Sequence, residues 1–459
     1  MLNQKLYELK NWNGVLHTTW NPDGPGVIRI HLVPPRFVPF KLVPSLVIIN
    51  GQDILPIGES QAILLSEYIK RVNEFGDKPM SDKELEDILA STFKGVKKVF
   101  PKVKDEVLEG DLDALIGVFE AIVKGEAIDS DYAKPITLGE YAPFMSAPHR
   151  MDLMVSAMTK DGHWHCNQKC LHCYAADQKL ADEKELTTEE WKKIIKTLQK
   201  AKISQLTFTG GEPTMRDDLP ELVKSARWFV TRLNTNGVNM TPELCGKLRE
   251  ADLDSVQITF YSDDKEVHNK LVGANNYDKT LDGIKNTIAA GLNMSVNTPL
   301  CTLNKEYRKT LEFLHELGVM YVTCSGLILT GNATEDASVK TQLTSEELYD
   351  VLKEAVEYAY ANDMEISFTS PGWIEEDKLK SMGLNIPSCG ACLSNMAVSP
   401  SGNVVPCQSW LSDEPLGNLL KSSWKSVWTS ENCKKIRDIS ARMDQKCQLR
   451  TRGEDKNCY

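Results

Sequence analysis

The chain has 459 residues, of which 41% are hydrophobic and 25% charged, and its formal net charge is −11. This composition excludes wholesale disorder, collagen and coiled coil, and an acidic chain is not a natural partner of nucleic acid or an anionic membrane. No apolar run reaches the roughly 20 residues of a membrane span, and the first residues lack the layout of a signal peptide. We therefore expect a cytoplasmic protein with no nucleic-acid or membrane partner.

Residues 1–130 are predicted to form a small α+β domain. Short apolar strands at 27–33 and 46–49 precede segments whose apolar residues recur at helical spacing, at 59–69, 82–90 and 112–122. The irregular, proline-containing stretch 131–150 is the predicted linker.

Residues 151–343 alternate strands with helices, which predicts an α/β fold with a parallel sheet. Six such repeats are too few for a closed eight-fold barrel, so we expect a partial (β/α)6 TIM barrel whose strand ends face a ligand. The predicted strands are 153–157, 205–208, 229–233, 255–260, 294–297 and 321–324. The predicted helices are 187–201, 242–251, 277–290 and 305–317.

The last region, 344–459, begins with a predicted helix at 345–361 and a strand at 365–369 and ends in a cysteine-rich tail. Cysteines that cluster in a reducing compartment more often bind metal than form disulfides. The isolated Cys245, Cys301 and Cys324 are interpreted as small buried hydrophobic residues.

Cys166, Cys170 and Cys173 form the first cysteine cluster, directly after the first barrel strand. Soft thiolates select zinc or an iron–sulfur cluster. Zinc would need a fourth ligand, which one of the nearby histidines could supply, whereas three thiolates leave one iron of a [4Fe–4S] cluster open. Spacing alone leaves both possibilities. The histidines concerned are His163, His165 and His172.

The segment Cys166-x3-Cys170-x2-Cys173, followed by Tyr174, resembles the signature of the radical S-adenosylmethionine (SAM) enzymes. After the next two predicted strands come Gly210-Gly211-Glu212-Pro213, which resembles the GGEP motif of that family, and the typical Asn-Thr-Asn-Gly of 234–237. The resemblance implies a [4Fe–4S] cluster on the three cysteines, SAM on its fourth iron, and a 5′-deoxyadenosyl radical as the hydrogen-abstracting species.

The resemblance also implies contacts to SAM. Gly210 and Gly211 would let backbone approach its methionyl end, Glu212 would accept a hydrogen bond from its amino group, Pro213 would stiffen the turn, and Tyr174 would lie beside the adenine. The polar residues at strand ends are further candidates for SAM contacts, with local capping as the alternative; they are Asn236, Gln257, Ser262 and Asn297. The sequence identifies no catalytic side chain.

Cys389-x2-Cys392 and Cys407, which enclose a predicted hairpin turn at 399–403, resemble the SPASM/twitch domain of many radical SAM enzymes. The resemblance implies one auxiliary [4Fe–4S] cluster on Cys389, Cys392 and Cys407, with Cys458 as fourth ligand and Cys447 as the alternative. Arg450 stands where a full SPASM tail has a further cysteine, so no second auxiliary cluster is expected. Cys433 is interpreted as a helix residue without a role as a ligand.

Residues 51–128 resemble a PqqD-like, winged-helix peptide-recognition element; a purely structural cap is the alternative. Together, the resemblances predict a radical SAM enzyme that modifies a ribosomally synthesised precursor peptide with a leader, forming a thioether or carbon–carbon crosslink. A flavodoxin- or ferredoxin-type protein would donate the electron. Alternatives are peptide epimerisation, modification of a tetrapyrrole or other small molecule, and a non-enzymatic iron–sulfur scaffold or redox sensor.

Overall fold

The computed structural model describes residues 2–11, 15–19, 27–38, 41–50, 53–76, 80–124, 126, 135–182, 184–442 and 446–451. The chain divides into two compact units. Unit 1 comprises Met1–Met145 with the short stretches Gln199–Gln205 and Trp228–Val230, and unit 2 comprises the remainder. None of the helices in these ranges is long and apolar enough to cross a membrane.

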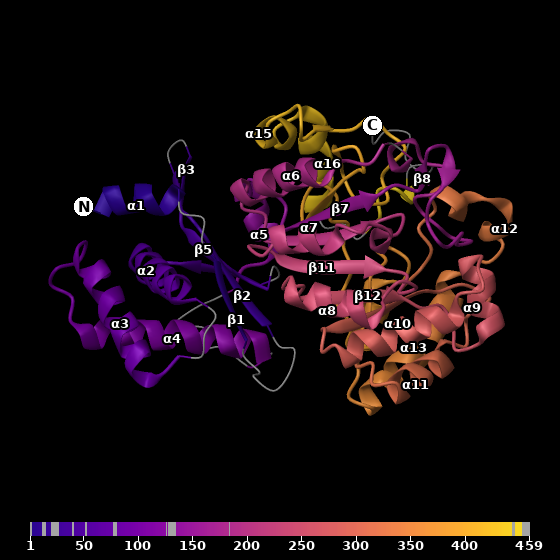
Figure 1. Ribbon diagram of the computed structural model, residues 1–459, viewed down its shortest axis with the longest axis horizontal. Coiled ribbons are helices and arrows are strands. Elements are labelled where there is room, and N and C mark those ends of the chain that lie inside the picture. The colour runs from indigo at the N-terminus through magenta and orange to yellow at the C-terminus, as the bar shows by residue number, and fades with distance from the viewer. Residues whose placement is uncertain are drawn as a thin grey trace. The chain divides into compact units, whose positions relative to one another are not determined.

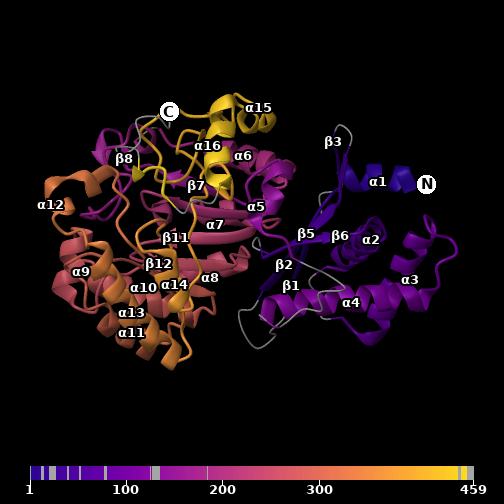
Figure 2. The same cartoon turned by 180° about the vertical axis from the view of Figure 1, so that it is seen from behind.

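Unit 1 contains a four-stranded antiparallel sheet followed by three helices, the order predicted from sequence. Its strand order is β1-β2-β5-β6, and α2 contacts β1, β2 and β5 (Figure 2). The elements are α1 (Leu2–Asn11), β1 (Val15–Thr19), β2 (Val27–Val33), β3 (Arg36–Val38), β4 (Lys41–Val43), β5 (Ser45–Ile49), β6 (Asp53–Ile57), α2 (Glu59–Phe75), α3 (Asp82–Lys97), α4 (Asp105–Lys124), α5 (Leu138–Tyr141) and the 3-10 turn η1 (Ala142–Phe144).

The core of unit 1 follows the two periodicities of its sequence. Alternate residues of β2, namely Ile28, Ile30 and Leu32, are buried on one face of the sheet. Residues at helical spacing on α2, such as Leu65 and Ile69, pack against that face.

Unit 2 is built on a ten-stranded sheet of order β15-β14-β13-β12-β11-β10-β7-β16-β17-β18. The pairs from β11 to β15 are parallel, as is β16 with β7, while β17 pairs antiparallel with β16 and β18. Its strands are β7 (Arg150–Ser156), β10 (Gln205–Gly210), β11 (Val230–Thr235), β12 (Ser255–Thr259), β13 (Met294–Pro299), β14 (Tyr321–Ser325), β15 (Glu365–Phe368), β16 (Asn395–Val398), β17 (Asn403–Val405) and β18 (Gly417–Asn418).

The helices between the strands lie outside the curved sheet (Figure 1). They are α6 (Thr188–Lys200), α7 (Leu219–Ser225), α8 (Pro242–Glu250), α9 (Lys265–Val272), α10 (Tyr277–Ala289), α11 (Tyr307–Glu316), α12 (Asp336–Val339) and α13 (Ser345–Ala361). The remaining elements are β8 (Thr159–Lys160), β9 (His163–Trp164), α14 (Glu376–Ser381), α15 (Trp424–Trp428), α16 (Glu431–Ala441) and the turns η2 (Lys179–Ala181), η3 (Pro213–Met215) and η4 (Gly331–Thr334).

The six predicted barrel strands are present, and four strands from the last region, β15 to β18, extend the same sheet. β15 pairs with the outer edge of β14, and β16 pairs with β7 through the register Asn395 to Arg150. The cysteine-rich tail is therefore continuous with the barrel sheet, which brings its loops next to the first barrel strand.

Candidate active site and iron–sulfur centres

A cavity of about 420 Å³ lies inside unit 2. Its wall consists of the loop that carries the first cysteine cluster, the turn after β10, and inward-facing residues of β7 and β11–β14. Cys166, Cys170 and Cys173 line it together with Glu212 and Asn236. The three sequence motifs therefore meet at one site, at the carboxyl ends of the strands.

Hydrogen bonds on two sides hold this first cysteine loop. The Leu171 N–H donates to the Leu271 carbonyl oxygen at 2.8 Å. Asn332 donates its backbone N–H to the Cys173 carbonyl at 2.9 Å and its side-chain N–H to the Cys170 carbonyl at 3.1 Å. The loop is thus fixed through its backbone groups, while the Cys166 thiol contacts the Gly211 carbonyl oxygen at 3.5 Å and all three cysteines line the cavity.

Burial controls the protonation of the three thiols. It raises the pKa of Cys166 to about 12 and raises the pKa of Cys170 and Cys173 as well. The protein alone therefore holds neutral thiols at pH 7. A bound metal reverses this preference because its positive charge stabilises the thiolates, so loading releases protons.

The arrangement of donors fits an iron–sulfur cluster better than zinc. In the described ranges, no three His, Cys, Asp or Glu side chains converge closely enough to hold a single metal ion, whereas the thiolates of a cluster bind different irons and lie further apart. Two of the candidate histidines have other partners: His172 Nε2 is hydrogen-bonded to Thr341 Oγ1 at 2.7 Å, and His165 Nε2 lies 3.7 Å from Glu185. His163 is exposed.

The two glycines after β10 are required by their closeness to β7. A Cβ on Gly210, whose φ is +140°, would lie 2.3 Å from the Ser156 carbonyl oxygen, and a Cβ on Gly211 would lie 2.7 Å from that of Ala157. The Gly211 N–H donates to Ser156 at 2.8 Å. Both glycines thus allow the turn to approach the first barrel strand closely, while the predicted approach to SAM stays a prediction.

Glu212 is buried and accepts four hydrogen bonds from the protein. Thr214 donates to Oε1 through its N–H at 3.0 Å and its hydroxyl at 2.6 Å, and the Thr235 hydroxyl donates at 2.6 Å. The Asn236 N–H donates to Oε2 at 2.8 Å. Burial raises the pKa of Glu212, while the four donors favour its ionised form. Because Glu212 also lines the cavity, Oε2 can accept one more hydrogen bond from a bound amine.

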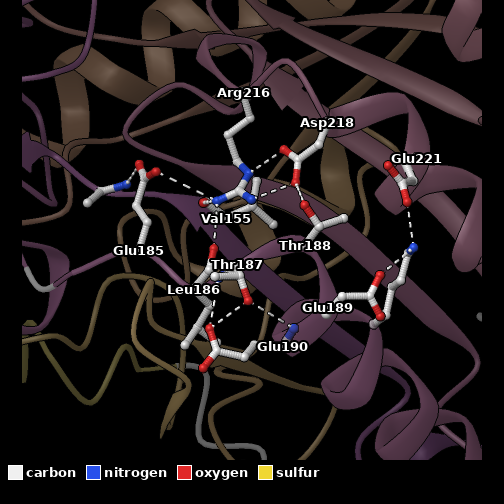
Figure 3. Close-up of polar contacts among 12 residues, drawn as sticks. Val155, Glu185, Leu186, Thr187, Thr188, Glu189, Glu190, Arg216, Asp218 and Glu221 are labelled. Carbon is white, nitrogen blue, oxygen red and sulfur yellow. Dashed lines mark hydrogen bonds and ion pairs between the residues drawn. The ribbon is translucent and has the colours of Figure 1, made fainter.

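Arg216, which the sequence analysis did not identify, ties the GGEP turn to the first barrel strand (Figure 3). Its Nη1 donates to the carbonyl oxygens of Val155 and Leu186 at 3.1 and 3.0 Å. Its Nε and Nη2 donate to Asp218 at 2.8 and 2.7 Å, and Nη1 lies 3.6 Å from Glu185. Arg216 is therefore a positioning residue behind the cavity wall.

The remaining predicted contacts divide into two groups. Asn236, Gln257 and Asn297 line the cavity, and the Thr323 hydroxyl connects the last two, accepting from Gln257 at 3.2 Å and donating to Asn297 at 2.8 Å. Ser262 lies outside the cavity lining, and its hydroxyl caps Asp264 N–H at 3.1 Å.

Of the two remaining motif residues, Tyr174 lies in the cavity lining and Pro213 lies outside it. Tyr174 lines the cavity, but its carbonyl already accepts from Gln178 at 3.0 Å and Thr330 at 3.3 Å. Pro213 is buried at the start of η3 behind the lining.

Several polar residues of the cavity were missed by the sequence analysis, although a pattern marks those on β11 to β14. On β11 to β14, every second residue faces the cavity, and these inward positions are almost all polar. A closed barrel fills its interior with branched apolar residues, so polar alternation indicates a hollow, ligand-binding interior. The missed residues include Arg150, Asp152, Thr207, Arg232, Thr259, Thr323, Ser325 and Gln408.

The cysteines of the tail gather at a second centre. Cys389, Cys407 and Cys447 belong to one packed cluster with the indole of Trp410. Gln448 Nε2 donates to Cys389 Sγ at 3.8 Å. Gln408, the residue after Cys407, lines the cavity, so this centre adjoins the candidate active site.

Cys433 on α16 lies at the same centre, which the sequence analysis did not anticipate. Arg437 Nη1 donates to the Cys433 sulfur at 3.4 Å, and the interaction with the Cys392 thiol lowers the pKa of Cys433. Arg437 is itself stacked 4.0 Å above the ring of Trp428. Of the two candidates for a fourth ligand, Cys447 is at the centre, whereas Cys458 lies outside the described residues.

Two family models match the chain. Residues 165–314 match the radical SAM superfamily, and residues 389–458 match an iron–sulfur cluster-binding domain, SPASM. The solved structure of SuiB from Streptococcus suis bound to precursor peptide SuiA is similar over 90% of this chain and 94% of that chain, with a TM-score of 0.60 and 14% sequence identity.

Curated relatives align over part of the chain. A mycofactocin maturase of Mycolicibacterium smegmatis is 27% identical over 289 residues, 60% of this chain and 70% of the relative. A PqqA peptide cyclase of Streptomyces rochei is 25% identical over 271 residues, 57% of this chain and 72% of the relative. An Fe-coproporphyrin III synthase of Methanosarcina barkeri is 35% identical over 155 residues, which are 33% of this chain and 38% of the relative.

A partial barrel with three cavity-facing thiols, a buried carboxylate above a glycine turn and a second cysteine centre defines an iron–sulfur enzyme. The chain is a radical SAM enzyme with a C-terminal SPASM domain. Cys166, Cys170 and Cys173 would hold a [4Fe–4S] cluster, which would supply the one-electron reduction needed for SAM cleavage. The chain's own residues shape this site: hydrogen bonds hold the first cysteine loop, Glu212 presents an acceptor to the cavity, and polar side chains line its interior.

Proposed function

We propose that this enzyme modifies a ribosomally synthesised precursor peptide, forming a thioether or carbon–carbon crosslink after hydrogen abstraction from a peptide carbon. The observation that carries the proposal is the combination of the radical SAM cavity with a SPASM centre adjoining it through Gln408. The PqqA peptide cyclase supports the peptide substrate, because this relative is named for acting on a peptide and aligns with 57% of this chain.

Unit 1 is proposed to bind the leader of that peptide. Among the described strands, β1 pairs with β2 alone, whereas the outer side of β6 is bridged at Ile54 by Ile136. An open strand edge offers unpaired backbone groups to an added strand. The leader would therefore extend the sheet at β1, independently of which residues react.

The electron for SAM cleavage is proposed to come from a flavodoxin- or ferredoxin-type donor, as expected for an enzyme that works in the cytoplasm. This partner would act on the clusters rather than on the peptide. Replacing such a donor by dithionite should preserve SAM cleavage.

Small-molecule modification is the second candidate, because the Fe-coproporphyrin III synthase is the most identical of the three relatives. Its alignment spans only 155 residues, about the length of the radical SAM match at 165–314. It therefore supports the shared chemistry more than a shared substrate.

The test uses the reconstituted enzyme, SAM, dithionite and the peptide encoded by any short reading frame beside its gene. We expect 5′-deoxyadenosine together with a peptide that has lost two hydrogen atoms per crosslink, measured by mass spectrometry with fragmentation. A peptide of unchanged mass beside rapid conversion of a coproporphyrin would contradict the proposal and favour the second candidate.

A further inference from the structure

Two arginines lie at the end of the cavity opposite to the first cysteine loop. Arg150 is the first residue of β7, and the parallel register aligns Arg232 of β11 with Ser255, the first residue of β12. The first cysteine loop, by contrast, follows the carboxyl end of β7. Both arginines line the cavity, so it has a cationic end remote from the thiols.

The two guanidinium groups are not equally neutralised. Arg150 Nε lies 3.0 Å from Asp152 Oδ1, which forms an ion pair. Arg232 has one long hydrogen bond, from Nε to Ser255 Oγ at 3.4 Å, and no carboxylate of the described residues lies within ion-pair distance of it. Burial and the nearby Arg150 lower the pKa of Arg232, and the charge of Asp152, which already pairs with Arg150, only partly opposes this; a guanidinium stays charged.

Arg232 is half-buried, and a partly dehydrated cation without a paired anion is unfavourable in a free protein, because its lost hydration is not replaced. The balance changes when a ligand supplies the anion. The planar fork of arginine matches the two oxygens of a carboxylate, with paired N–H···O bonds.

A second set of observations also points to a ligand in this cavity. Four buried oxygen atoms of the cavity lining have no hydrogen-bond partner among the described residues, although most buried polar groups are paired in native proteins. The side chain of Asp152 is only 2% exposed. The residues that carry these atoms all line the cavity; the atoms are Asp152 Oδ2, Thr207 Oγ1, Asn234 Oδ1 and Gln408 Oε1.

We infer that Arg232, with Arg150 beside it, binds a carboxylate of the substrate at this end of the cavity, while N–H groups next to that carboxylate meet the unpaired acceptors. The inference rests on the proposed function and narrows its substrate to a peptide that presents a carboxylate to the interior. That group is either the C-terminal carboxylate or the side chain of an Asp or Glu. The carboxylate of SAM is a separate ligand, since SAM is held at the cysteine end.

The test measures binding of three capped amino acids to the reconstituted, SAM-loaded full chain by calorimetry. N-acetylalanine carries only a C-terminal carboxylate, N-acetylglutamate α-amide only a side-chain carboxylate, and N-acetylglutamine α-amide neither. One of the first two should bind roughly tenfold or more tightly than the neutral probe, as expected for a hydrogen-bonded charge pair. Which of the two binds more tightly identifies the source of the carboxylate.

Variants of Arg232 test whether this residue causes the tighter binding of the carboxylate probes. Arg232→Gln should abolish it, Arg232→Lys should retain part of it, and Arg308→Gln should leave it intact, because Arg308 is an exposed arginine on α11 that pairs with Glu312. SAM binding and iron content should be unchanged in all three. If Arg232→Gln fails to load iron, a reduced preference for the carboxylate probes in Arg232→Lys supports the inference instead.

Equal binding of all three probes to the wild type, or an undiminished preference in Arg232→Gln or Arg232→Lys, would overturn the inference. Because the assay contains no precursor peptide, its outcome does not depend on peptide modification. A carboxylate preference in an enzyme that modifies no peptide would defeat the proposed function and leave a small carboxylate as the substrate.

Discussion

Glu212 connects the turn after β10 to the end of β11, because its two oxygens accept hydrogen bonds from Thr214, Thr235 and Asn236. In Glu212→Gln, either orientation of the amide would direct an N–H group at a protein donor. A buried unpaired donor costs roughly 1–3 kcal/mol. We expect SAM affinity to fall by about tenfold to a hundredfold, measured by equilibrium dialysis of labelled SAM.

The control for this variant is Glu243→Gln on the exposed surface of α8, which should bind SAM as the wild type does. Wild-type SAM affinity in a folded Glu212→Gln enzyme would show that the carboxylate shapes the wall without contacting SAM.

The three cysteines of the first loop should carry one cluster and all SAM cleavage. Replacing Cys166, Cys170 and Cys173 together by Ala should remove about four irons per chain and abolish 5′-deoxyadenosine formation, while the auxiliary iron stays. Cys245→Ala, a buried single cysteine that touches Thr287, is the matched control and should keep all its iron. Deoxyadenosine from the triple variant would refute the assignment.

His268 gives the enzyme a pH dependence of stability. Burial lowers its pKa from 6.5 to about 4, and its Nδ1 accepts the Tyr261 N–H at 3.4 Å. Below pH 6.5 the unfolded chain binds a proton that the folded chain refuses, so the free energy of unfolding falls as pH drops from 6.5 to about 4. Over this pH range, His268 lowers the free energy of unfolding by an amount on the order of 3 kcal/mol.

Urea unfolding of the reconstituted enzyme at pH 7 and pH 5 would measure this effect. His268→Gln, which keeps an acceptor for Tyr261 but does not titrate, should show a smaller difference between the two pH values. His163→Gln at an exposed position should behave as the wild type does. An equal pH dependence in His268→Gln would mean that other groups dominate.

At the scale of elements, local patterns predicted the helices and strands well where both caps and periodicity agreed. The predicted helix at 345–361 is α13, because Thr344 and Glu347 form a capping box at its start. The sheet partners of β15 and β16 were not predictable, since a strand's own residues show its propensity but not the edge it will join. The proximity of α16 to Cys392 depends on that same long-range pairing.

The fourth ligand of the auxiliary cluster is an element-scale prediction, because it depends on which part of the tail folds back onto the cysteines. Cys447 packs with Cys389 and Cys407. Cys447→Ala should therefore lower reconstituted iron from about eight to about four per chain, while Cys458→Ala and Cys433→Ala retain about eight. Loss of iron in Cys458→Ala alone would favour the other end of the tail, and loss in Cys433→Ala would make the α16 thiol a ligand.

For the whole molecule, the motifs predicted the cavity and its cofactors, whereas the substrate-facing residues required the structure. The cysteines and GGEP turn are contiguous in sequence and therefore visible there. Arg150, Asp152 and Arg232 come from two strands that tertiary contacts alone bring to one cavity end. No contiguous pattern marks such a group, although alternation of polar residues along each strand hints at the interior they share.

Unit 1 and unit 2 are proposed to have separate roles, with unit 1 binding the leader and unit 2 carrying the SAM cavity. If unit 1 binds the leader through backbone hydrogen bonds at β1, affinity for the peptide does not depend on its reacting residues. Binding then raises the effective concentration of the core at the cavity in unit 2. Deleting residues 1–130 should weaken binding of a labelled leader strongly and leave SAM cleavage without peptide near its original rate. Fluorescence anisotropy and deoxyadenosine formation measure the two effects, with Arg308→Gln as a full-length control. Unchanged leader affinity in a folded, cluster-loaded truncation would instead make unit 1 a structural cap.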